Sequence, residues 1–178
     1  AFMSMVGMTI LHHIVNYEKV YDPAVLLSRL DTEISDLLIT KNQRDHGFEG
    51  MDTAICCIDT NTHQMVFSSA QRPVIIVKDG EAITYKGSIY PIGENYDDIH
   101  KIFSNTTIDL NENDTIYLFS DGYTSQFNEE NTKKFNYQRF RKLLTDLSEK
   151  QLKDQPAIIH RTFEAWRGSS HQIDDILI

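Results

Sequence analysis

Three aspartates stand where carboxylates could hold a metal ion. Asp121 directly follows the apolar run 115–120, and Asp174 and Asp175 directly precede the apolar run 176–178. If these two runs pair as antiparallel strands, the end of the first lies beside the start of the second, which places Asp121 next to Asp174. Neighbouring carboxylates repel each other unless a proton or a cation lies between them. Because aspartate oxygens suit Mg²⁺ or Mn²⁺ better than zinc, we consider these residues candidate ligands of such a cation.

Each acidic site also has a plainer interpretation. Asp121 with Gly122 reads locally as an ordinary Asp-Gly turn, which the local sequence alone favours. In the metal hypothesis, Gly122 supports the turn that presents Asp121. Successive residues of a strand point to opposite faces, so at most one of Asp174 and Asp175 faces a buried site, and Asp175 is the weaker candidate.

Other chemistries find little support. The sequence contains no glycine-rich phosphate loop, no Gly-x-Ser-x-Gly, no His-Glu-x-x-His and no Cys-x-x-Cys, and its seven histidines lack the spacing of metal ligands. With 17 basic and 26 acidic residues, the net charge of −9 disfavours binding to nucleic acid or to anionic membranes. No apolar run approaches the roughly 20 residues of a membrane span. We therefore expect a cytoplasmic domain, although a longer parent protein could be anchored upstream of it.

The hydrophobic patterns predict the elements that must position the aspartates. Helical spacing occupies residues 1–15, a second segment that starts with Asp22 as N-cap and Pro23 as first helical residue, and residues 137–147 and 159–166. The first helix is apolar nearly all round, which predicts a buried helix. A last strand is expected from Ile173. The other expected strands are Thr53–Ile58, Met65–Ala70, Val74–Val77, Ala82–Tyr85, Ile102–Ile108 and Thr115–Ser120.

The order of these elements predicts the fold class. The strands cluster instead of alternating with helices, which is typical of an α+β protein with mainly antiparallel sheets. Several strands, such as those at 54–58 and 116–119, are apolar on both phases and are expected to be covered on both faces. We therefore predict a four-layer αββα sandwich, in which two packed sheets are flanked by helices.

A set of short segments, found in the same order as in a known family, adds to this prediction. The segments are Gly50-Met51-Asp52-Thr53-Ala54, Arg72-Pro73 with Lys78-Asp79-Gly80-Glu81, Pro91-Ile92-Gly93, Leu118-Phe119-Ser120-Asp121-Gly122-Tyr123, and Phe163-Glu164-Ala165-Trp166-Arg167-Gly168 with Gln172-Ile173-Asp174-Asp175. They resemble motifs of the metal-dependent PPM-type (protein phosphatase 2C-like) serine/threonine phosphatases. The likeness is greater to the bacterial branch named for stage II sporulation protein E (SpoIIE) and the RsbU-type regulators of stress sigma factors. Each segment is a weak signal alone, but the set covers essentially the whole chain.

The resemblance implies a function and a site. It implies hydrolysis of phosphoserine or phosphothreonine by a water that bridges two Mn²⁺ or Mg²⁺ ions, with Asp121 and Asp174 as ligands of one metal and Asp175 as a weaker match. The substrate would be an anti-sigma factor antagonist or a similar phosphoprotein, and a sensor or regulatory domain would lie upstream in the parent. The first two helices match a pair that acts as a regulatory switch in this branch and supports homodimers. Helices that simply pack on the sheet are an equally good interpretation.

One departure from the family pattern qualifies these expectations. In the family, a metal-bridging aspartate lies in an Asp-x-x-Gly-His-Gly type motif just before Pro-Gly-Ala-Phe-Met-Ser, whereas this sequence begins at Ala1-Phe2-Met3-Ser4. We therefore expect residues 1–178 to form a single phosphatase domain that lacks one or more N-terminal strands and a few C-terminal residues. Such a domain would expose a sheet edge, which could also support a dimer. It would bind metal weakly and show little or no activity. The alternative is a noncatalytic interaction or dimerisation module that keeps the phosphatase fold.

Overall fold

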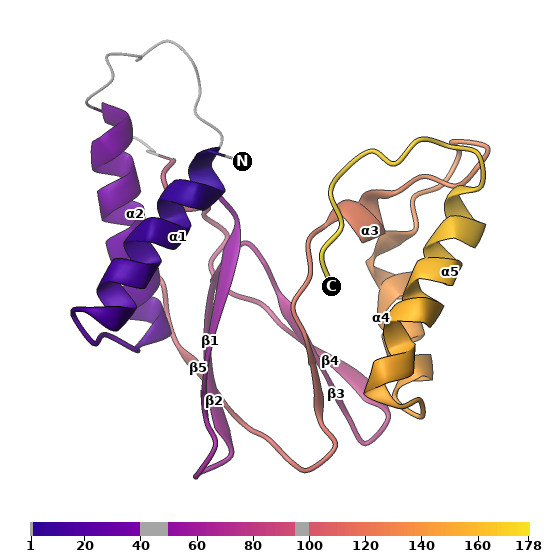
Figure 1. Ribbon diagram of the computed structural model, residues 1–178, viewed down its shortest axis with the longest axis horizontal. Coiled ribbons are helices and arrows are strands. Elements are labelled where there is room, and N and C mark those ends of the chain that lie inside the picture. Colours follow the sequence, from indigo (N-terminus) through magenta and orange to yellow (C-terminus); the bar gives the residue numbers. More distant parts are fainter. Residues whose placement is uncertain (1, 40–49, 95–99) are drawn as a thin grey trace. The chain divides into compact units, whose positions relative to one another are not determined.

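The computed structural model describes residues 2–39, 50–94 and 100–178 (Figure 1). The chain divides into two compact units. The first unit contains residues 1–73 and 86–110, and the second contains residues 74–85 and 111–178.

The first unit begins with two helices that pack on each other, α1 (Phe2–Asn16) and α2 (Pro23–Ile39). The predicted start of α2 is confirmed. Asp22 caps it, because a carboxylate oxygen of Asp22 accepts a hydrogen bond from the Val25 N–H at 2.9 Å. The predicted burial of α1 on all sides is wrong. Ile14 is fully buried, but Met5 and Met8 are 64% and 72% exposed, because α1 packs on α2 along one side only.

The sheet of the first unit is antiparallel, with strand order β1-β2-β5. Its strands are β1 (Thr53–Asp59), β2 (Gln64–Ala70) and β5 (Thr106–Asp109). Helix α2 packs against β1 and β2. Strand β1 lies at the edge of this sheet, and its apolar residues are only partly buried, so its predicted cover on both faces is incomplete.

The sheet of the second unit is also antiparallel, with strand order β4-β3-β6. Its strands are β3 (Val74–Lys78), β4 (Glu81–Tyr85) and β6 (Thr115–Tyr117). The turn between β3 and β4 has positive φ at both Asp79 and Gly80, the backbone of a type I′ hairpin. Strand β6 ends at Tyr117, three residues before the predicted end.

The helices of the second unit are α3 (Gly122–Ser125), α4 (Asn136–Leu147) and α5 (Gln155–Arg167), with a 3₁₀ turn at Leu152–Asp154. The two predicted C-terminal helices are thus confirmed. Helix α4 packs on β3 and β4. Four aromatic side chains of this core lie around one another, with Tyr123 in contact with Phe135, Phe140 and Phe163 at centroid distances of 4.8, 5.2 and 5.1 Å. These contacts fix the position of α3 directly after Asp121.

The predicted strand from Ile173 does not form. Residues 173–178 are irregular, with a bend at Asp174, although the Ser120 N–H donates to the Leu177 carbonyl at 3.0 Å. The physical reason is that the Asp175 carbonyl and the Leu177 N–H bond to the Ser120 hydroxyl. In a continuing strand ladder, these groups would bond to the backbone of the neighbouring strand. The predicted fold class is confirmed, with helices and two antiparallel three-stranded sheets. None of the described helices is both long and apolar enough to span a membrane.

Candidate metal centre

Asp121 occupies a fixed position at the start of α3. Its carbonyl accepts hydrogen bonds from the Ser125 N–H at 2.8 Å and from the Thr124 hydroxyl at 3.0 Å. The residue has helical backbone angles and is half-buried. The local sequence therefore forms a short helix at this point instead of the simple Asp-Gly turn considered above.

Asp174 and Asp175 lie in the irregular segment that follows α5. Both are exposed, and a carboxylate oxygen of Asp174 accepts a hydrogen bond from the Asp175 N–H at 2.8 Å. The side chain of Gln172 donates to the Asp174 carbonyl at 2.8 Å. The expectation that the two carboxylates point to opposite faces relied on a strand, and no strand forms here, so that argument no longer separates Asp174 from Asp175.

Ser120 and Gly122 bring this segment next to Asp121. The Ser120 hydroxyl donates to the Asp175 carbonyl at 2.8 Å and accepts from the Leu177 N–H at 3.0 Å. A Cβ atom on Gly122 would lie 2.4 Å from the Asp175 carbonyl oxygen, far inside van der Waals contact. Glycine is therefore needed at position 122 for the two acidic segments to approach this closely.

The donor chemistry at this place fits Mg²⁺ or Mn²⁺. Such hard cations are commonly held by one or two carboxylates, with water and phosphate oxygens as the other ligands. Within residues 2–39, 50–94 and 100–178, no group of three or more histidine, cysteine, aspartate or glutamate side chains could hold a metal ion. The role of Asp121 and Asp174 as metal ligands therefore stays a prediction.

Sequence reasoning missed a further residue near these aspartates. Gln126, directly after α3, is completely buried, and its side-chain amide bonds to the backbone of His171 and Ile173. No local pattern distinguishes this glutamine from a solvated one, because its partners lie 45 and 47 positions away in the sequence.

The three motif segments of the first unit, at residues 50–54, 72–73 and 91–93, contact one another. Met51 and Ile92 exchange two backbone hydrogen bonds at 2.8 and 3.0 Å, and Asp52 forms an ion pair with Arg72 at 3.2 Å. A Cβ on Gly50 would lie 2.6 Å from the Pro91 ring, so this contact also requires glycine. These segments therefore join the start of β1 to the backbone around Ile92.

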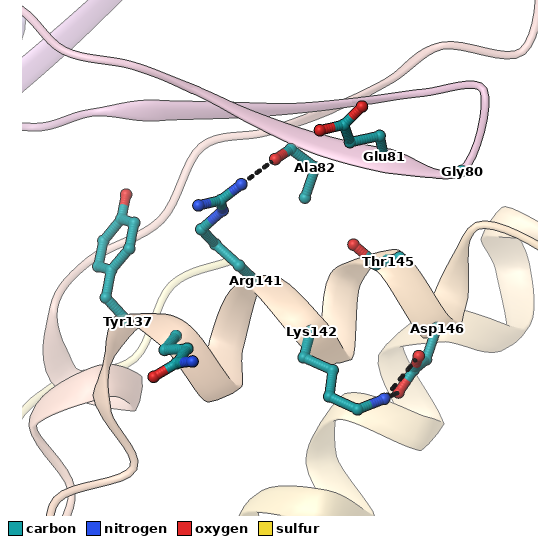
Figure 2. Close-up of a pocket in the computed structure, with 9 residues that line it drawn as sticks. Gly80, Glu81, Ala82, Tyr137, Arg141, Lys142, Thr145 and Asp146 are labelled. Atoms are coloured by element: carbon teal, nitrogen blue, oxygen red, sulfur yellow. Dashed lines mark hydrogen bonds and ion pairs between the residues drawn. The ribbon is translucent and has the colours of Figure 1, made fainter.

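The second unit also contains an open pocket of about 600 Å³ between the β3-β4 turn and α4. Figure 2 shows that Arg141 of α4 points to the Ala82 carbonyl, and that Lys142 is paired with Asp146 on the same helix. None of the three candidate aspartates lines this pocket. It is therefore separate from the predicted metal centre.

Comparisons with known proteins agree with the fold and with the motifs. The family model described as stage II sporulation protein E (SpoIIE) matches residues 1–178. Among curated proteins, no sequence matches significantly. The SiaA-PP2C domain of Pseudomonas aeruginosa is similar in structure, with a TM-score of 0.84 and 26% identity over 99% of this chain and 67% of that chain.

Two further structures share the fold at lower identity. The PP2C phosphatase domain of Bacillus subtilis SpoIIE, solved with a fragment of its regulatory domain, matches with a TM-score of 0.73 and 16% identity over 98% of this chain and 48% of that chain. The RsbU and RsbW domains of a Mycobacterium tuberculosis protein match with a TM-score of 0.71 and 16% identity over 99% of this chain and 45% of that chain.

Proposed function

The chain belongs to the family of stage II sporulation protein E, and from this membership we propose that it acts as a metal-dependent serine/threonine phosphatase domain in a bacterial signalling regulator. The observation that carries the proposal is the match of the family model to all 178 residues. The fold is that of a phosphatase-like signalling domain, as in the SiaA relative. The enzymatic activity and the substrate are proposed in addition to the family and the fold.

In this proposal, Asp121 and Asp174 hold one Mn²⁺ or Mg²⁺ ion. Such an ion, when bound, lowers the pKa of its water toward neutrality and offsets the negative charge of a phosphoryl group. The protein would contribute the two carboxylates, and Ser120 and Gly122 support this by contacting the backbone of Asp175, directly after Asp174. Asp175 contributes its backbone carbonyl to this arrangement, which supports a role in positioning over a role as a ligand.

The proposed substrate is a phosphoserine or phosphothreonine on a small protein, such as an anti-sigma factor antagonist. The net charge of −9 repels a phosphorylated partner, so cations at the site are needed to attract the phosphate. The same negative charge disfavours binding to nucleic acid, which is itself negatively charged.

A homodimer is a further part of the proposal. Met5 and Met8 of α1 are largely exposed and lie three residues apart on one face of the helix, where they offer an apolar surface suited to a second copy of the helix pair. The partly exposed edge strand β1 offers the alternative surface. We also propose a cytoplasmic location and a sensor domain elsewhere in the natural protein, in keeping with the family.

Residues 1–178 alone are expected to bind Mn²⁺ weakly and to show little or no activity, because two carboxylates supply few of the ligands that a tight site needs. The chain spans about half the length of two of the structures that it matches. Activity is therefore best measured on the full-length natural protein.

The experiment measures release of phosphate from a phosphoserine peptide by that full-length protein in Mn²⁺. We expect Asp121→Asn to lower the rate by more than about 100-fold, since even groups outside the ligand set typically contribute roughly 10- to 100-fold. Asp146→Asn is the matched control, because Asp146 lies on α4 and pairs with Lys142. Equal turnover by Asp121→Asn contradicts the proposal. No turnover by the wild-type protein instead favours a noncatalytic interaction module.

A further inference from the structure

We propose that Gln126 is a positioning residue that holds Asp174 beside Asp121, an inference that rests on the proposed function of these aspartates as metal ligands. Gln126 carries no charge and is completely buried. Its role would be to fix the backbone that carries Asp174, and thereby to set the affinity of the site for its cation.

The contacts of Gln126 are directed at the segment just before Asp174. Its side-chain NH₂ donates to the His171 carbonyl at 3.0 Å and to the Phe127 carbonyl at 3.2 Å, and its side-chain oxygen accepts from the Ile173 N–H at 3.2 Å. The partners define the orientation of the amide, because two carbonyls require the NH₂ group and an N–H requires the oxygen. A buried glutamine is costly unless it is satisfied in this way.

Gln126 is itself held by other elements of the second unit. Its backbone carbonyl accepts hydrogen bonds from the Trp166 indole N–H at 3.0 Å and from the Phe135 N–H at 2.8 Å. The rings of Trp166 and Phe135 also pack edge to face, with centroids 5.3 Å apart. The glutamine is therefore a rigid support for the C-terminal segment.

Helix α3 sets the distance between this support and the first aspartate. Asp121 lies immediately before the helix and Gln126 immediately after it. On the other side of Asp174, the Ser120 hydroxyl bonds to the Asp175 carbonyl and the Leu177 N–H. Asp174 thus lies between two side-chain supports, one on each flank.

The need for such supports follows from the irregular backbone around Asp174. Residues 173–178 form no strand, so no ladder of backbone hydrogen bonds fixes the carboxylate. A site with few ligands binds its cation well only if the ligands are already held in the binding geometry. Groups that orient metal ligands typically contribute roughly 10- to 100-fold to affinity. Loss of the Gln126 amide should therefore weaken cation binding while the rest of the unit stays folded.

The test compares Gln126→Met with Gln155→Met, a control that the same unit provides. Gln155 is also a buried glutamine, 3% exposed, and it bonds to the Tyr117 hydroxyl at 2.6 Å and the Leu147 carbonyl at 3.1 Å. Both variants lose a buried side-chain amide. The hydrogen-bond partners of Gln155 lie outside residues 171–177, so its loss should leave the segment that carries Asp174 in place. Mn²⁺ titration followed by paramagnetic broadening of backbone amide NMR signals detects weak binding, and hydrogen exchange of the Ile173 amide reports the release of the segment.

We expect Gln126→Met to raise the Mn²⁺ dissociation constant about 10-fold or more and to accelerate exchange at Ile173, with Gln155→Met close to wild type in both. Unchanged Mn²⁺ affinity in a folded Gln126→Met overturns the inference and leaves the proposed function standing. A wild-type chain without broadening at Asp121 and Asp174 contradicts the proposed metal site itself.

A second variant covers the case in which Gln126→Met does not fold. Ser120→Ala removes the support on the other flank of Asp174, at a half-buried position. It should likewise weaken Mn²⁺ binding and accelerate exchange at Leu177, whose N–H loses its acceptor. Wild-type values for both measurements in Ser120→Ala overturn the idea that side-chain supports set the affinity.

Discussion

At position 122, the space between two backbone segments leaves room for a hydrogen atom and nothing larger. Gly122 does not have a positive φ, so its backbone conformation alone does not require glycine. The requirement comes from the Asp175 carbonyl oxygen, which would lie 2.4 Å from a Cβ atom. This is steric evidence that the backbone after Asp121 and the segment of Asp174 and Asp175 lie close together.

Gly122→Ala is expected to separate the two acidic segments. The added methyl group must displace the backbone at Asp175, because the clash is with backbone atoms that cannot rotate away. We expect a rise of about 10-fold or more in the Mn²⁺ dissociation constant, measured by calorimetric titration.

Gly80→Ala is the control for this variant. Gly80 has a positive φ and open space around it, so alanine there strains the β3-β4 turn without touching the acidic segments. It should lower the stability of the protein and leave Mn²⁺ affinity unchanged. Wild-type Mn²⁺ affinity in Gly122→Ala would show that the close approach is irrelevant to the site.

The sequence singles out Asp121 and Asp174 as ligand candidates, which stay a prediction, but it does not reveal the residues that contact their segments. Asp121 and Asp174 stand out because each directly adjoins an apolar run, and Gly122 is part of the same motif as Asp121. Gln126 carries no such signal. Its role depends on a chain reversal that brings residue 171 back to residue 126, which no local spacing records.

Among the elements, α2 shows most clearly how local sequence sets a boundary. Asp22 accepts from the Val25 N–H at 2.9 Å and from the side-chain NH₂ of Asn105 at 2.7 Å. These two hydrogen bonds, the first being the larger cause, lower the pKa of Asp22 below its ordinary value of 3.8. The carboxylate is therefore stabilised in its ionised form in the folded protein.

Asp22→Ala should lower the free energy of unfolding by about 1 kcal/mol near neutral pH, the usual cost of a lost N-cap. Because the folded pKa is lower than the unfolded one, this stabilisation is present above about pH 4 and is lost as the pH falls through the folded value. Urea unfolding at pH 7 and pH 3 measures it. Asp22→Asn, which keeps an acceptor for the Val25 N–H, should lose less, and a loss as large as that of alanine at pH 7 would contradict the capping role.

The accuracy of the predicted elements follows from how local their determinants are. Helix α2 was predicted from its Asp22 cap and its apolar spacing, and α4 and α5 were predicted from apolar spacing, all of which are local to the segment. The last strand was predicted wrongly: Ile176-Leu177-Ile178 has a strand-like sequence, but its expected partner β6 ends at Tyr117, and the Ser120 hydroxyl bonds to the Asp175 carbonyl and the Leu177 N–H. The exposure of Met5 and Met8 was missed for a related reason, because apolar content does not show which face another helix covers.

For the molecule as a whole, the order of the motifs was more informative than any single one. The α+β class and the antiparallel sheets followed from clustered strands, and the resemblance to SpoIIE-type phosphatases agrees with the family model over residues 1–178. The division of the chain into two units was not predicted. It arises because β3 and β4 join a sheet with the distant β6, a long-range pairing that the sequence pattern does not encode.

The charge of the whole molecule links the fold to its proposed chemistry. A protein with a net charge of −9 that removes phosphate from another protein needs cations where the phosphate binds. We therefore propose that Asp121 and Asp174, far apart in the sequence, share one divalent cation.

The most direct test is to map Mn²⁺ on the chain by paramagnetic broadening of its backbone amide NMR signals. We predict that signals around Asp121 and Asp174 broaden together at the same Mn²⁺ concentration, and that Asp121→Asn abolishes the broadening at both places. Broadening that begins at different concentrations for the two segments, or that persists at Asp174 in Asp121→Asn, would contradict a shared site.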